Sequence, residues 1–212
     1  MTKNNNQSLL ISYLIMRRLI GILGISLPVV LIIGLGIKGS ENAFQDSISD
    51  YYHTPMRDFF VGILCGIGLF LFSYKGYIDK DSRYKYKDNI AGNIACILAL
   101  LVAFCPTSGT VVGKIHLISA GLFLLTLAFF SLYLFTKGET DTKRKRRRTR
   151  IYKWCGSIII ACVVFLILYF IIPDSYLTGL SKCKPILILE IVALWAFGIS
   201  WITKGKLFWE DI

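Results

Sequence analysis

Six apolar stretches, each about 20 residues long, occupy most of this chain of 212 residues. The hydrocarbon core of a bilayer is about 30 Å thick, and a helix rising about 1.5 Å per residue crosses it in about 20 residues. The mean hydropathy of +0.61 agrees with this interpretation. We predict an all-α, polytopic bundle of six transmembrane helices, a single integral membrane domain over residues 1–212. The predicted spans are residues 19–37, 59–74, 89–104, 115–136, 154–172 and 186–203.

Two arginines mark the start of the first span. Arg17 and Arg18 precede an apolar run that is too long for a signal peptide and lacks a cleavage motif, so we expect an uncleaved helix. A charge in the middle of a membrane costs several kcal/mol. We therefore expect the apolar residues 9–16 to form a separate short helix at the membrane surface.

The basic residues are distributed unequally between the two sides of the predicted membrane. The N-terminus, the loops after the second and fourth spans, and the C-terminus carry 19 lysines and arginines, against 5 in the other loops. By the positive-inside rule, we expect both termini to be cytoplasmic. We expect the protein to be a multi-pass protein of the cell (plasma or inner) membrane. The basic run at residues 143–150 falls in the loop before the fifth span. We assign this run to anionic lipid headgroups and not to nucleic acid.

Small residues indicate where the helices pack closely. Alanines at positions 91, 95, 99 and 103 form a stripe along the third span, and Gly62 and Gly66 form a GxxxG motif in the second. Such stripes let helix backbones approach each other in lipid, so we place the second and third spans at the bundle centre. A homo-oligomer interface would have the same pattern. Cys105 and Cys183 both lie at outer ends of spans, which leaves a disulfide between them open.

Ionisable residues within a membrane are functional candidates because they are costly to bury. Three helices that run from outside to inside each end in Lys-Gly, and counting back from these ends puts His53 and His116 at the outer boundary. The same count puts Glu190 in the outer third of the membrane. We expect these groups to converge in an outer polar pocket. The candidate residues are Ser49, Asp50, His53, Arg57, His116 and Glu190.

Three interpretations of this cluster remain open. It could be a structural cap, in which Glu190 pairs with Arg57 or a histidine and Asp50 caps the second span. It could recognise a lipid headgroup or small polar ligand, with Arg57, Lys114 and the histidines meeting a phosphate. It could also hold zinc through His53, His116 and a carboxylate, Asp50 or Glu190, as in a metal-dependent intramembrane hydrolase.

Three stretches of the chain resemble known membrane proteins. They are residues 47–62 (SISDYYHTPMRDFFVG), His116 with Ala120 and Phe123, and Glu190 followed by Phe197–Trp201 (FGISW). Together they resemble an uncharacterised group of small bacterial six-helix membrane proteins and, more distantly, the superfamily of damage-regulated autophagy modulators. The resemblance implies a shared outer site and a link with lipid signalling and membrane organisation, without an agreed role for each residue.

The leading functional hypothesis is a non-enzymatic membrane sensor or organiser whose outer pocket binds a lipid headgroup or small ligand. We assign no catalytic residue, no resident metal and no cofactor, because the sequence contains no phosphate-binding glycine loop, no CxxC and no nucleophile elbow. The alternatives are the zinc hydrolase described above and a membrane-disrupting or pore-forming effector.

Overall fold

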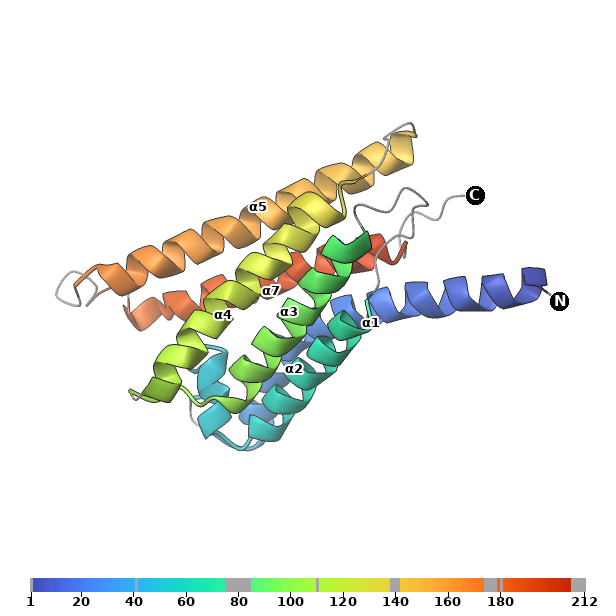
Figure 1. The fold of residues 1–212 in the computed structure, drawn as a ribbon. Coiled ribbons are helices and arrows are strands. Elements are labelled where there is room, and N and C mark those ends of the chain that lie inside the picture. Colours follow the sequence, from blue (N-terminus) through green and yellow to red (C-terminus); the bar gives the residue numbers. More distant parts are fainter. Residues whose placement is uncertain are drawn as a thin grey trace.

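The computed structural model describes residues 2–40, 42–74, 85–109, 111–137, 142–173, 179 and 181–206, and their regular structure is helical. Long helices lie side by side in an elongated bundle (Figure 1). They are α1 (Thr2–Ile37), α2 (Arg57–Phe72), α3 (Lys85–Phe104), α4 (Val111–Phe129), α5 (Lys143–Ile171) and α7 (Pro185–Lys204). Short helices η1 (Ser49–His53) and η3 (Ser181–Cys183) flank them, and a π-helical turn, η2 (Phe130–Leu134), continues α4. The all-helical prediction is confirmed for these residues.

Four of these helices are long and apolar enough to cross a membrane. They are α1 from Ser12 onward, α4 together with η2, α5 and α7. Their length and composition indicate a membrane protein. Apolar side chains are widely exposed on the outside of the bundle, as in Leu69 of α2 and Ile97 of α3, which are 59% and 60% exposed.

Helix α1 runs without interruption from Thr2 to Ile37, so the prediction of a separate surface helix at residues 9–16 is wrong. The helix continues through Arg17 and Arg18 because both side chains contact other groups of the folded chain. The Arg17 guanidinium lies 4.3 Å from the centre of the Tyr13 ring and 5.4 Å from that of Tyr74, where cation–π attraction stabilises it. Arg18 Nε donates a hydrogen bond to the Gly205 carbonyl over 2.9 Å.

The basic run at residues 143–150 is helical and does not belong to a loop. Helix α5 begins at Lys143, well before the predicted span, and Thr142 caps it by accepting a hydrogen bond from the Lys145 amide over 3.3 Å. Lysine and arginine are good helix formers, so the helix extends beyond the apolar segment. Hydropathy indicates where the apolar segment begins, and helix α5 begins before that segment.

Glycine allows the close crossing of α1 and α7. A Cβ added to Gly198 would lie 2.6 Å from the Gly21 carbonyl oxygen, which leaves no space for a side chain. The predicted alanine stripe also packs: Ala95, Ala99 and Ala103 are fully buried, and Ala99 lies beside Gly68 of α2. The predicted glycine motif of α2 does not pack at Gly62, because a Cβ there would meet nothing within 4 Å.

An aromatic cluster fills the core near the end of α7. Trp201 is fully buried, with ring centres of Tyr74 and Phe135 each 5.0 Å away and that of Phe130 at 5.4 Å. The rings meet edge-on or tilted, which are favourable arrangements for aromatic pairs. This cluster joins α2, η2 and α7 at one end of the bundle.

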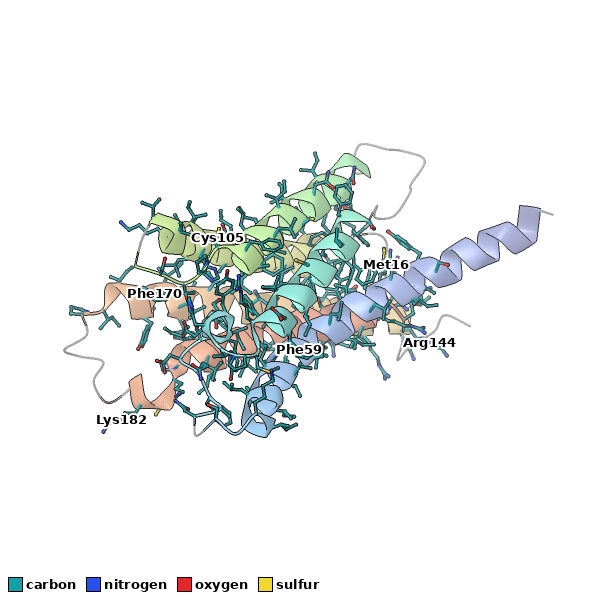
Figure 2. The ribbon with its side chains drawn as sticks, turned by 90° about the horizontal axis from the view of Figure 1, so that it is seen from below. Met16, Phe59, Cys105, Arg144, Phe170 and Lys182 are labelled. Carbon is teal, nitrogen blue, oxygen red and sulfur yellow. The ribbon has the colours of Figure 1, made fainter. Side chains whose placement is uncertain are left out.

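The opposite end, where α1 ends and α2 and α7 begin, carries η1; we call it the η1 end. Cys105, Phe170 and Lys182 lie toward it, whereas Met16 and Arg144 lie toward the other end (Figure 2). Tyr51 anchors η1 by donating a hydrogen bond from its hydroxyl to the Ala43 carbonyl over 2.6 Å. Burial raises the pKa of Tyr51, so its phenol stays protonated and remains a donor.

Candidate functional site

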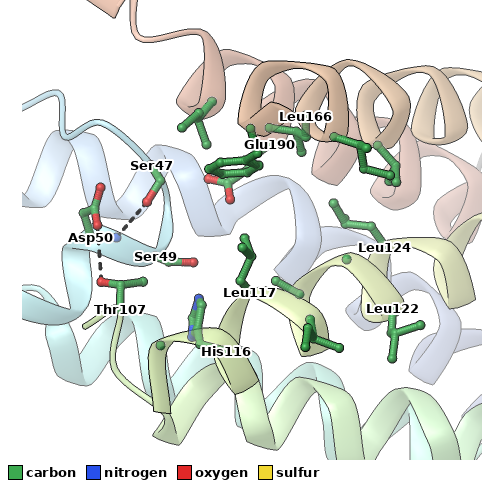
Figure 3. A pocket seen from close by; sticks show the side chains of 18 of the residues that line it. Ser47, Ser49, Asp50, Thr107, His116, Leu117, Leu122, Leu124, Leu166 and Glu190 are labelled. Atoms are coloured by element: carbon green, nitrogen blue, oxygen red, sulfur yellow. Dashed lines mark hydrogen bonds between the residues drawn. The ribbon is translucent and has the colours of Figure 1, made fainter. Parts of the chain in front are cut away.

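A cavity of about 640 Å³ lies between α4, α5 and α7 at the η1 end. Most of its wall is apolar, contributed by α4 from Leu117 to Leu125 and by α5 from Val163 to Ile171. Polar side chains gather at one end of the cavity (Figure 3). These polar residues are Ser47, Ser49, Asp50, Thr107, Ser108, His116 and Glu190.

The cavity is open along the side of the bundle. Leu117, Ile167 and Phe170 line it and are still 49%, 51% and 52% exposed. Gly121 also lines it, and a Cβ there would meet nothing within 4 Å. In a membrane, acyl chains surround this side of the bundle. An elongated apolar molecule could therefore enter from the bilayer without crossing an aqueous phase.

Glu190 brings α7 into contact with the segment before η1. Its Oε2 accepts a hydrogen bond from the Ile48 amide over 2.6 Å, and one turn earlier the Leu187 amide donates to the Asp46 carbonyl over 3.1 Å. The side chain of Glu190 points into the cavity (Figure 3).

His116 contributes an acceptor that has no partner among the described residues. Its Nδ1 lies 2.7 Å from the Cys105 carbonyl oxygen. A carbonyl oxygen can only accept, so Nδ1 carries the proton, and in the neutral ring Nε2 keeps a lone pair. The side chain is 3% exposed, and Nε2 is buried without a hydrogen bond in the part of the chain that the structure describes.

Asp50 is held by hydroxyl groups on both sides. Thr107 donates from its Oγ1 to Asp50 Oδ1 over 3.3 Å, and the Asp50 amide donates to Ser47 Oγ over 3.1 Å (Figure 3). His53 joins this network at the rim, where its Nε2 lies 3.2 Å from Thr107 Oγ1. His53 is exposed and does not line the cavity.

Arg57 lies apart from the other predicted site residues. Its Nη2 donates to the Tyr52 hydroxyl over 2.8 Å, and its guanidinium lies over the Tyr52 ring at 4.5 Å. The predicted pairing of Arg57 with Glu190 is therefore wrong. Asp50 does not cap α2 either, because the N-cap residue is Met56, which makes no side-chain hydrogen bond there.

The structure thus brings together four of the six predicted site residues: Ser49, Asp50, His116 and Glu190. No three His, Cys, Asp or Glu side chains within the described ranges lie close enough to hold one metal ion, so the hydrolase alternative has no ligand set there. Cys105 and Cys183 are both free thiols, which does not support the disulfide.

Sequence reasoning missed the apolar wall and the polar lining residues Ser47, Thr107 and Ser108. Thr107 and Ser108 follow Pro106 in a short loop, and nothing in their spacing distinguishes them from other turn residues. One feature of the α4 sequence could have indicated the apolar wall of the cavity. Ala120 and Gly121 are small residues within a run of large apolar ones, and such a pair leaves space beside a helix.

Comparison with models of protein families, with curated proteins and with solved structures finds no match for this chain. We therefore infer the function from the geometry of the cavity.

Proposed function

We propose that this chain is a non-enzymatic sensor or organiser of the cell (inner) membrane that binds a lipid-like amphiphile in the cavity between α4, α5 and α7. The observation that supports this most strongly is the shape of the cavity, which has a long apolar wall, a side open to the bilayer and one polar end. A volume of about 640 Å³ is in the range of sites for small organic ligands. The alkyl chain of such an amphiphile would contact the apolar wall of the cavity, and its polar head would contact the polar end.

The same proposal includes six transmembrane spans with the η1 end outside and both termini in the cytoplasm. Helices α2 and α3 pack against α1 and α4 along the same bundle (Figure 1), although α2, with 16 residues, is short for a span. Arg18 of α1 contacts Gly205 after α7, so the start of the apolar part of α1 and the end of α7 lie at one end. The basic start of α5 would then meet anionic lipid headgroups on the cytoplasmic side.

We expect a membrane-impermeant maleimide to label Cys183 in intact cells, since Cys183 is exposed at the η1 end. The variant Cys183→Ser should lose this labelling. A cysteine placed at the exposed Thr142, in the Cys183→Ser background, should react only after the membrane is permeabilised. Labelling of Thr142→Cys in intact cells would reverse the proposed orientation.

Photocrosslinking tests the binding proposal. A fatty alcohol with a diazirine in its alkyl chain, added to the protein in bilayers, should crosslink to residues 117–125 of α4 and 163–171 of α5. Unlabelled fatty alcohol in excess should suppress these crosslinks. Labelling spread evenly over the exposed faces of α1, α2 and α3, and insensitive to competitor, would contradict a specific site.

This proposal includes the resemblance to the small bacterial six-helix proteins and to the autophagy-modulator superfamily. The resemblance assigns no role to individual residues. It agrees with the cavity in one respect: the residues that carry it include Ser49, Asp50, His116 and Glu190, which line the cavity.

A further inference from the structure

The polar end of the cavity is built from hydrogen-bond acceptors. It contains two carboxylates, Asp50 and Glu190, and the deprotonated Nε2 of His116. The other polar lining groups are hydroxyls, which can adapt to either role. Among the described lining residues there is no lysine and no arginine. Among the described lining residues, the end of the cavity therefore presents hydrogen-bond acceptors and no cationic side chain.

Several of these acceptors have capacity left for a ligand. An ionised carboxylate has about four lone-pair sites. Among the described residues Ile48 is the donor to Glu190 and Thr107 the side-chain donor to Asp50, so each carboxylate keeps sites for further donors. The lone pair of His116 Nε2 has no partner there at all. A buried acceptor without a donor is unfavourable, so a donor supplied by a ligand would stabilise the complex.

We propose that the head of the bound amphiphile is a primary ammonium group, with its alkyl chain along the wall formed by α4 and α5. An ammonium group has three N–H donors and one positive charge. It can donate to Glu190 and His116, which point into the cavity from α7 and α4 (Figure 3), and to a hydroxyl such as that of Ser49. This inference rests on the proposed function and specifies its ligand class.

The charges argue against the other head groups. A phosphate or carboxylate head would lie beside two carboxyl groups, with no lysine or arginine among the described residues that line the cavity, and a like-charge contact is costly in a poorly hydrated site. A hydroxyl head could donate to His116 but would leave the carboxylates uncompensated. The phosphate-binding role predicted for Arg57 does not apply here, because Arg57 contacts Tyr52 and lies outside the cavity.

The test compares hexadecylamine, hexadecanol and hexadecanoate, which share one alkyl chain, by native mass spectrometry of the full-length protein in mild detergent. We expect hexadecylamine to be retained about tenfold more than hexadecanol, as one charge-assisted hydrogen bond predicts. Hexadecanoate should be retained least. Glu190→Gln should remove the preference for the amine over the alcohol. The control variant Asp58→Asn removes an exposed carboxylate outside the cavity and should keep the preference.

The outcomes separate this inference from the proposed function. Equal retention of all three compounds, or a preference for hexadecanoate, would overturn the ammonium head while leaving the apolar site in place. Failure of all three to bind would count against both. An amine preference that persists in Glu190→Gln would also overturn the inference. Should Glu190→Gln fail to fold, His116→Leu removes the unpartnered acceptor from α4 and should lower amine retention in the same assay.

Discussion

Replacing Gly198 by leucine is expected to prevent α1 and α7 from packing together. A Cβ at this position would lie 2.6 Å from the Gly21 carbonyl oxygen and 2.5 Å from Ile25 Cγ1, and the rest of the leucine needs still more space. A flexible side chain could move aside, but the backbone of α1 cannot move without separating the helices. We expect a loss of about 3 kcal/mol or more of stability, since overpacking by a few methylenes already costs about 1–3 kcal/mol.

Thermal unfolding and size-exclusion profiles of the purified variant would measure this effect. Gly62→Leu is the matched control, because Gly62 is also helical and a Cβ there meets nothing within 4 Å. The control should unfold at or slightly above the temperature of the natural protein, since leucine has the higher helix propensity. Equal stability of the two variants would show that α1 and α7 do not cross at Gly21 and Gly198.

The long helices were predictable because apolar runs of about 20 residues are typical of helices that cross a bilayer. Predicted and observed helices agree to within about four residues for α2, α3 and α7. Agreement failed where a helix continues beyond its apolar segment. Residues 2–8 of α1 and 143–153 of α5 are mostly polar or charged, and a hydropathy window cannot distinguish such a segment from a loop.

Close packing was predicted in part. The alanine stripe on α3 was predictable because four small residues at one regular spacing favour close backbone contact in a membrane helix. The crossing of α1 and α7 was missed because Gly21 and Gly198 are single glycines in distant parts of the chain, and each sequence stretch alone shows no motif. Gly62 and Gly66 matched a motif that the fold does not use at Gly62.

At the candidate site, the sequence identified residue types but not partners. Counting residues along the helices predicted that His116 and Glu190 lie near the same end of the bundle, and both line one cavity. The partner of Glu190 is the backbone amide of Ile48, which no side-chain pattern can reveal. Arg57 turns toward Tyr52 because that ring is five residues away in a neighbouring turn, a local contact that competes with any distant one.

The cavity lies between α4 and α5, and Gly121 offers a way to fill it. Gly121→Phe would add a ring to the apolar wall, and a Cβ there meets no atom within 4 Å, so we expect the fold to accept it. Replacing glycine within a helix also removes an entropic penalty of up to about 1 kcal/mol, which favours the folded state. The variant should therefore remain stable and lose its bound amphiphile.

The measurement that tests the central claim most directly is the amount of lipid-like material bound to the purified protein, by native mass spectrometry, for the natural chain, Gly121→Phe and Gly62→Phe. The control places the same ring on α2, away from the cavity, where a Cβ also meets nothing within 4 Å. A bound amphiphile that is retained in the natural chain and in Gly62→Phe, and lost from a stable Gly121→Phe, is the result we predict. Equal amphiphile content in both variants would contradict binding in the cavity between α4 and α5.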